Sequence, residues 1–397
     1  MSSRAVLPLL KSGSLPWRRD LAPAANELHH ALAAVAPERF AAAVDVELRS
    51  RADVFLRGVE RYRHHNYRRN LPEPPVLWQE GTTRLLDYGP PGGAPLLVVP
   101  SLVNRAYILD LSAEKSLLRH LSAAGARPLL VDWGRPGEIE RGFTLTDYIA
   151  GRLEAAADAA AAVAGAPFAV IGYCMGGLLA LALAQRRSAL VRALALLATP
   201  WDFHAERAGH AQLVGGLAEP LTRVFGALGE IPVDVLQSLF AALDPLLALR
   251  KFTRFAGLPA DSAEERDFVA LEDWLNDGVP LSLPVARECL AGWYAANTPR
   301  RGTWRVAGSP ILPRRVTVPS LVVVPGQDRI VPPATAVALA DALPAAKRLS
   351  PPLGHIGMMV ARDAPKAVWQ PLVEWLAAHG SSATGSKSRR RRLSKGK

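Results

Sequence analysis

Five short apolar segments, separated by helix-like stretches, limit this chain to a small set of folds. Apolar side chains fill almost every position in them, as in parallel strands covered on both faces. The intervals 109–124 and 145–164 have helical patterns. The alternation predicts an α/β fold with a mostly parallel sheet and helices on both faces. The segments are PLLVVP (95–100), PLLVDW (128–133), PFAVIGYC (167–174), ALALLATP (193–200) and PSLVVVPGQD (319–328).

The interval between the fourth and fifth segments is too long for a single crossover helix. Residues 205–305 contain amphipathic stretches such as VDVLQSLFAALDPLLALRKF and VALEDWLNDG. We expect an inserted helical cap over the carboxyl ends of the strands, where open α/β sheets bind ligands.

Changes in composition divide the rest of the chain. Residues 1–75 are expected to form an N-terminal helical region that ends in a LPEPP linker, and residues 76–380 the catalytic α/β domain. The formal net charge is +11, and the last eleven residues hold seven basic residues and no acid. We expect residues 381–397 to be a disordered basic tail, the only part suited to nucleic acid.

Composition also excludes some classes of protein. A chain of 397 residues, 49% of them hydrophobic, can bury a large core. Two cysteines are too few for a disulfide scaffold and fit a reducing compartment. No apolar stretch is long enough to span a bilayer. We therefore expect a cytoplasmic protein without a membrane span.

The third apolar segment ends in GYCMGG, where Gly172, Cys174 and Gly176 form a G-x-C-x-G pattern. A nucleophile elbow needs a sharp turn from strand to helix and small residues around it. The turn directs the N–H of Met175 toward the place where an oxyanion forms, and the helix N-terminus favours negative charge there. We predict that Cys174 is the nucleophile, assisted by Met175 and by a second donor in the 102–103 loop, Val103.

A cysteine nucleophile needs a base, and the base needs an orienting acid. In elbow enzymes both follow the nucleophile, the acid first. Asp328 comes directly after the fifth apolar segment, and His355 follows in the glycine-bounded loop PPLGHIG. These two residues are the predicted acid and base.

Other residues remain candidates for the acid and the base. Asp202, in TPWDFH, follows the fourth segment and is an alternative acid. His204 and His210 lie in the expected cap. The pairs His29–His30 and His64–His65 have adjacent side chains on opposite sides of a helix or strand, so they lack metal-ligand spacing. We expect no metal site and no cofactor, and a structural role for Cys289.

A sulfur nucleophile favours a particular reaction. Exchange of an acyl group between two thiols is close to isoenergetic, so an acyl group taken from a thioester stays activated on the cysteine. A serine would hold it as a more stable ester. The sequence therefore favours acyl transfer from a thioester such as acyl-CoA over plain ester hydrolysis.

Several motifs occur together in one order. They are PSLVNRAYILDL (100–111), VDWGRPG (131–137), GYCMGG (172–177), GQDRIVPP (326–333) and GHIG (354–357), together with CLAGWYAANTPRRGTWRVAGSPI (289–311). In these motifs, over about residues 78–355, the chain resembles the poly(3-hydroxyalkanoate) synthases. The resemblance implies an α/β-hydrolase fold with a cap, and a Cys–His–Asp triad acting on 3-hydroxyacyl-CoA.

In that family the cysteine takes the acyl group, the histidine is the base, and the aspartate helps to activate the 3-hydroxyl. The matching residues are Cys174, His355 and Asp328. The family usually has histidine after the aspartate, where this chain has Arg329. The chain length is closer to that of synthases with a second subunit. The partners implied are the growing polyester, its granule surface, a second synthase subunit and further copies of the chain.

Two other functions stay open at this stage. A polyester depolymerase or thioesterase would use the same triad with water as the acceptor. A protein that associates with granules or nucleic acid through its basic tail would carry the triad as a remnant.

Overall fold

The computed structural model describes residues 8–206 and 208–379. Its centre is an eight-stranded sheet in the order β1-β2-β4-β3-β5-β6-β11-β12. The strands from β4 to β12 in this order are parallel, and β2 is antiparallel to both of its neighbours. The prediction of a mostly parallel sheet is confirmed. The strands are β1 (Val76–Glu80), β2 (Thr83–Asp87), β3 (Ala94–Val99), β4 (Ala126–Asp132), β5 (Phe168–Tyr173), β6 (Val191–Leu197), β11 (Ser320–Val323) and β12 (Ala346–Leu349).

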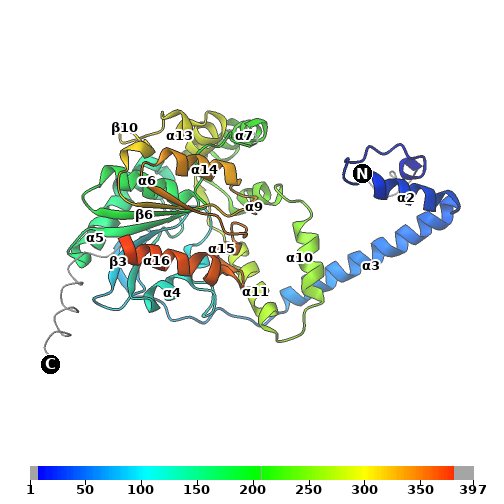
Figure 1. Cartoon of the computed structure of the whole chain (residues 1–397), viewed down its shortest axis with the longest axis horizontal. Coiled ribbons are helices and arrows are strands. Elements are labelled where there is room, and N and C mark those ends of the chain that lie inside the picture. Colours follow the sequence, from blue (N-terminus) through cyan, green and yellow to red (C-terminus); the bar gives the residue numbers. More distant parts are fainter. Residues whose placement is uncertain (1–7, 207, 380–397) are drawn as a thin grey trace, which may run out of the picture. The chain divides into compact units, whose positions relative to one another are not determined.

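Alternate side chains of each buried strand enter two different cores. In β3, Leu97 and Val99 pack in the first core, which also contains the inner faces of α5 (Glu154–Ala164) and α6 (Met175–Arg186). Leu96 and Val98 pack in the second core, with α4 (Leu117–Ala123) and α16 (Gln370–His379). Figure 1 shows α6 and α14 (Pro333–Ala342) on one side of the sheet and α4 and α16 on the other. Burial on both faces explains why these strands are apolar throughout.

The interval between β6 and β11 is mostly helical. Two short antiparallel strand pairs interrupt it, β7 (Glu230–Ile231) with β8 (Leu281–Ser282) and β9 (Arg305–Val306) with β10 (Ser309–Pro310). The helices are α7 (Ala208–Gly215), α8 (Ala218–Phe225), α9 (Val233–Ala241), α10 (Leu247–Ala256), α11 (Ala263–Asn276), α12 (Leu283–Arg287), the π-helix η4 (Glu288–Ala295) and α13 (Thr298–Arg301).

The described chain divides into two compact units. One holds the residues up to Asn66 together with Pro245–Phe268, and the other holds Tyr67–Asp244 and the residues from Val269 onward. The sheet and the candidate catalytic residues belong to the second unit. The expected boundaries at residues 75 and 380 and the cap at 205–305 remain predictions, and the expected tail at 381–397 lies outside the described residues.

The first unit is built on two helices far apart in sequence. The long helix α3 (Pro37–Arg63), which follows α2 (Ala22–Ala33), packs against α10. At Gly58 a Cβ atom would lie 2.0 Å from the carbonyl oxygen of Phe252, so the missing side chain permits this close approach. Arg61 forms an ion pair with Glu265 at 2.6 Å and also donates to the carbonyl oxygen of Phe255.

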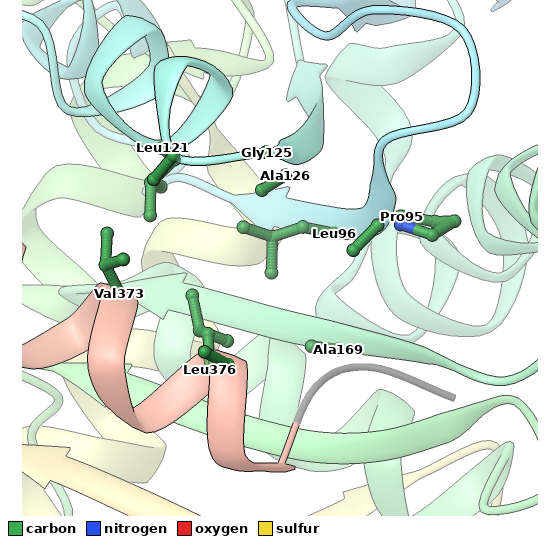
Figure 2. A pocket seen from close by; sticks show the side chains of 11 residues that line it. Pro95, Leu96, Leu121, Gly125, Ala126, Ala169, Val373 and Leu376 are labelled. Carbon is green, nitrogen blue, oxygen red and sulfur yellow. The ribbon is translucent and has the colours of Figure 1, made fainter. Parts of the chain in front are cut away.

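A small apolar cavity of about 100 Å³ lies between β3, β5, α4 and α16 (Figure 2). Its lining residues include Leu96, Ala169 and Leu376. Leu96 and Ala169 are at the amino ends of their strands, whereas Cys174 follows the carboxyl end of β5. The cavity is therefore separate from the candidate active site. Within residues 8–206 and 208–379, every helix is too short or too polar to cross a bilayer.

Candidate active site

Cys174 occupies the sharp turn between β5 and α6. Its φ of 55° and ψ of −127° are unfavourable for a residue with a side chain. The turn is held because the Cys174 N–H donates to the Leu197 carbonyl at 2.8 Å, and the Gly177 N–H donates to the Cys174 carbonyl at 3.0 Å. The sulfur-bearing side chain is partly exposed. The backbone therefore has the strained geometry expected of a nucleophile elbow.

Two glycines of GYCMGG have no room for a side chain. A Cβ at Gly176 would lie 2.3 Å from the carbonyl oxygen of Val99, and one at Gly177 would lie 1.8 Å from the hydroxyl oxygen of Thr199. The first helical turn of α6 thus packs directly on the end of β3 and on the segment that follows β6. This close packing fixes the position of Cys174.

Asp328 and His355 come together at the carboxyl end of the sheet. Nδ1 of His355 lies 2.7 Å from Oδ2 of Asp328, and the two residues are 6% and 5% exposed. The other carboxylate oxygen accepts the N–H groups of Ile330 at 2.9 Å and Val331 at 2.8 Å. A carboxylate only accepts hydrogen bonds, so Nδ1 of His355 carries the proton in this contact.

The other imidazole nitrogen of His355 faces the cysteine. The interaction with Cys174 is one of the causes that raise the pKa of His355, and because Asp328 occupies Nδ1, the nitrogen left for the sulfur is Nε2. Burial alone would lower the pKa of His355. Negative charge on Cys174, the hydrogen bonds to Asp328 and Cys174, and the charge of Asp328 outweigh burial and raise that pKa to about 10. The three residues form a continuous chain of contacts from carboxylate to sulfur, and their catalytic roles remain predictions.

The two predicted oxyanion donors differ in their surroundings. Met175 begins α6, so its N–H has no partner within the helix and points out of the helix end. The Val103 N–H donates to the hydroxyl oxygen of Ser101 at 3.0 Å. The Val103 N–H can donate to an oxyanion only if its hydrogen bond to Ser101 breaks. The donor roles of Met175 and Val103 remain predictions.

The alternative acid, Asp202, contacts other groups. Its Oδ1 accepts from Nδ2 of Asn297 at 2.8 Å and from the N–H of His204 at 3.0 Å, and its Oδ2 lies 3.3 Å from Nε of Arg300. Nε2 of His204 lies 2.8 Å from the carbonyl oxygen of Tyr294. These contacts join the loop after β6 to η4 and α13. The side chains of Asp202 and His204 therefore stabilise the fold at this place.

The other candidate histidines contact groups away from Cys174 or lie exposed. Nδ1 of His64 lies 2.9 Å from the carbonyl oxygen of Glu60, and Nε2 of His65 lies 3.6 Å from Glu265. His210 is exposed on α7. Among the residues that the structure describes, no three His, Cys, Asp or Glu side chains gather as a metal site.

Three further residues belong to the surroundings of the site. Cys289 on η4 is buried, and its burial and the charge of Glu288 raise its pKa well above the usual value, so it stays a thiol. Burial, followed by charge on Cys174 and Cys289, raises the pKa of Tyr294. Arg329, beside the candidate acid, is exposed and pairs with Asp244 at 2.8 Å.

Sequence reasoning missed Tyr173, although it stands within the elbow motif. Its hydroxyl donates to the main-chain carbonyl of His355 at 3.3 Å. The only signal in the sequence is a hydroxyl-bearing aromatic residue directly before the cysteine.

Comparisons with known proteins identify the family and the fold. A family model described as alpha/beta hydrolase fold matches residues 94–361. A poly(3-hydroxyalkanoate) polymerase subunit PhaC from Synechocystis sp. is 30% identical over 319 residues, which cover 76% of this chain and 83% of that protein. The subunit of that name from Haloferax mediterranei is 27% identical over 322 residues, covering 78% of this chain and 64% of the relative.

The fold likeness extends to solved structures of low sequence identity. A putative non-heme bromoperoxidase, BpoC, from Mycobacterium tuberculosis superposes with a TM-score of 0.50 at 18% identity, covering 79% of this chain and 99% of that one. This likeness concerns the fold alone.

Proposed function

Because the chain belongs to the α/β-hydrolase fold family and, within it, to the poly(3-hydroxyalkanoate) polymerases, we propose that it transfers 3-hydroxyacyl groups from coenzyme A to a growing polyester. The proposed residues are Cys174 as nucleophile, His355 as base and Asp328 as the orienting acid. The chain spans 64% of the length of the Haloferax relative. The complete activity is therefore proposed for this chain and not carried over from its relatives.

The observation that carries the proposal is a cysteine on a strained elbow, in contact with a buried His–Asp pair. A thiolate attacks thioesters readily, and the product is again a thioester. The acyl group keeps its activation until an acceptor hydroxyl arrives. Plain hydrolysis would gain nothing from this property, so the sulfur favours transfer.

The first half-reaction loads the enzyme. Nε2 of His355 takes the proton of Cys174, and the sulfur attacks the carbonyl carbon of the thioester. The new C–S bond forms as the bond to the sulfur of coenzyme A breaks, and the leaving thiolate takes the proton back from His355. In this proposal the N–H of Met175 stabilises the oxyanion of the tetrahedral intermediate between attack and departure.

The second half-reaction releases the cysteine. A hydroxyl group at the end of the polyester gives its proton to His355 and attacks the acyl carbon. The C–S bond to Cys174 breaks, an ester bond forms, and the proton returns to the sulfur. Asp328 keeps the proton of the neutral imidazole on Nδ1, so Nε2 is the nitrogen that accepts the proton and later returns it.

We also propose that the chain works with other chains, either a second synthase subunit or a second copy. Large apolar side chains are exposed on and beside α7, α8 and α9. Because exposure of apolar surface to water is unfavourable, these side chains support an interface with another chain. They are Leu213, Val224, Leu228, Phe240 and Leu243. Sedimentation of the purified chain, alone and after co-purification, tests this.

The test of function is the release of coenzyme A from 3-hydroxybutyryl-CoA by the purified chain, with analysis of the product. Cys174→Ala should abolish release, and the matched variant Cys289→Ala should retain it. Insoluble polyester supports the proposal, whereas free hydroxy acid alone identifies a hydrolase. Equal release by the wild type and Cys174→Ala refutes the role of the cysteine.

A further inference from the structure

Tyr173 joins the nucleophile to the loop of the base. It is the last residue of β5 and directly precedes Cys174. Its hydroxyl donates to the main-chain carbonyl of His355 at 3.3 Å, and its ring centroid lies 5.2 Å from that of the imidazole at an interplanar angle of 33°. The side chain therefore contacts both the backbone and the ring of His355.

These contacts complement the one from Asp328. The carboxylate of Asp328 contacts only Nδ1 of the imidazole. This contact does not fix the main chain of His355, which lies in the loop between β12 and α15 (Gly357–Val360). The hydroxyl of Tyr173 holds the main chain of that loop. The Tyr173 backbone continues directly into the strained turn at Cys174. A displacement of His355 relative to the sulfur thus requires Tyr173 to break its contact.

We propose that Tyr173 is a positioning residue, which sets the distance between Cys174 and His355 through its hydroxyl and supports the charged imidazole with its ring. The inference rests on the proposed roles of these two residues in acyl transfer. It adds to them a residue that touches neither the substrate nor the reacting sulfur.

The chemistry of the phenol fits this role. Burial raises the pKa of Tyr173 well above its usual value, and negative charge on Cys174 and Asp328 raises it further. The hydroxyl therefore remains protonated, and able to donate, at neutral pH. An aromatic ring also attracts a cation within about 6 Å of its centre, which favours His355 in its protonated form.

The proposal is tested by alkylation of Cys174 with iodoacetamide as a function of pH, followed by mass spectrometry. Tyr173→Phe removes only the hydroxyl, which is a neutral hydrogen-bond donor, so the rate near neutral pH should fall about 2- to 10-fold. The pH of half-maximal rate should rise, because a displaced His355 accepts the thiol proton less readily. Release of coenzyme A should show a lower kcat with little change in KM.

The matched control is Tyr148→Phe. Tyr148 is also a buried tyrosine, but its ring packs edge-on against Trp133 and Phe143. This variant should leave the pH profile of alkylation unchanged. An unchanged profile and kcat in Tyr173→Phe, or equal shifts in both variants, would overturn the proposal.

A second measurement separates positioning from a general loss of stability. If Tyr173 acts through His355, its effect on alkylation should shrink in an Asp328→Asn background, where Nε2 already lacks the lone pair that accepts the thiol proton. Additive effects would count against the proposal. Alkylation needs no acyl substrate, so this test remains decisive even if the wild type releases no coenzyme A and the proposed function fails.

Discussion

Replacement of Asp328 by asparagine should reverse the protonation of the imidazole while leaving the loop intact. The N–H groups of Ile330 and Val331 both donate to Oδ1. In the asparagine variant these two donors require the amide oxygen at that place, which puts the amide NH₂ where Oδ2 now meets His355. Nδ1 of His355 must then accept, and its proton moves to Nε2. The nitrogen that faces Cys174 loses its lone pair.

The expected loss of activity is large. An enzyme whose histidine is held in the wrong tautomer typically loses a factor of about 10² to 10⁴ in turnover. That range corresponds to about 3–5 kcal/mol of transition-state free energy. The pKa of His355 should fall as well, since burial, which lowers it, is then opposed by less negative charge.

The assay is single-turnover release of coenzyme A, with alkylation of Cys174 as a second reading. Asp202→Asn is the matched control, because Asp202 contacts Asn297 and Arg300 and should change the rate by less than about twofold. A full rate in Asp328→Asn, or an equal loss in Asp202→Asn, would refute the assignment of the acid.

Four other predictions concern stability. The folded-state pKa of His355 is raised from 6.5 to about 10, so its contribution is complete below pH 6.5 and is lost as the pH rises toward 10. In urea unfolding, the free energy of unfolding should decrease by on the order of a few kcal/mol between pH 6.5 and pH 10. His355→Gln should remove most of this dependence on pH. Gly177→Ala should cost about 1–3 kcal/mol by overpacking against Thr199 and should be partly rescued by Thr199→Ala. Gly176→Ala meets main-chain oxygens instead, so no side-chain change should rescue it in thermal unfolding. Asp110→Asn should lower the free energy of unfolding, measured by urea denaturation, by about 3–5 kcal/mol. The reason is that Asp110 is fully buried and pairs with two arginine side chains.

The elements that could be predicted are those with a strong local pattern. The five apolar segments correspond to β3, β4, β5, β6 and β11, because burial on both faces demands apolar residues throughout. The edge strand β12 could not be found this way. Its sequence AKRL is largely exposed, and its pairing with β11 comes from the neighbour and not from its own composition.

The candidate site shows a similar division. Asp328 and His355 follow from the order of residues in elbow enzymes. The bond from the Val103 N–H to Ser101 and the contact of Tyr173 with His355 depend on loop geometry, which has no periodic pattern. The packing of α10 on α3 could not be predicted either, because no pattern in the sequences of these two distant helices marks them as partners.

That last contact has a consequence for the synthesis of the chain. Arg61 and its acceptor Phe255 are 194 residues apart, so α3 leaves the ribosome long before α10 exists. At about 5–20 residues per second the delay is roughly 10–40 s. During this time Phe55 and Tyr62, which later pack on Phe252, lack their partner. The surface of α3 that later packs on α10 is thus exposed on the nascent chain throughout this interval, and chaperones can bind it there.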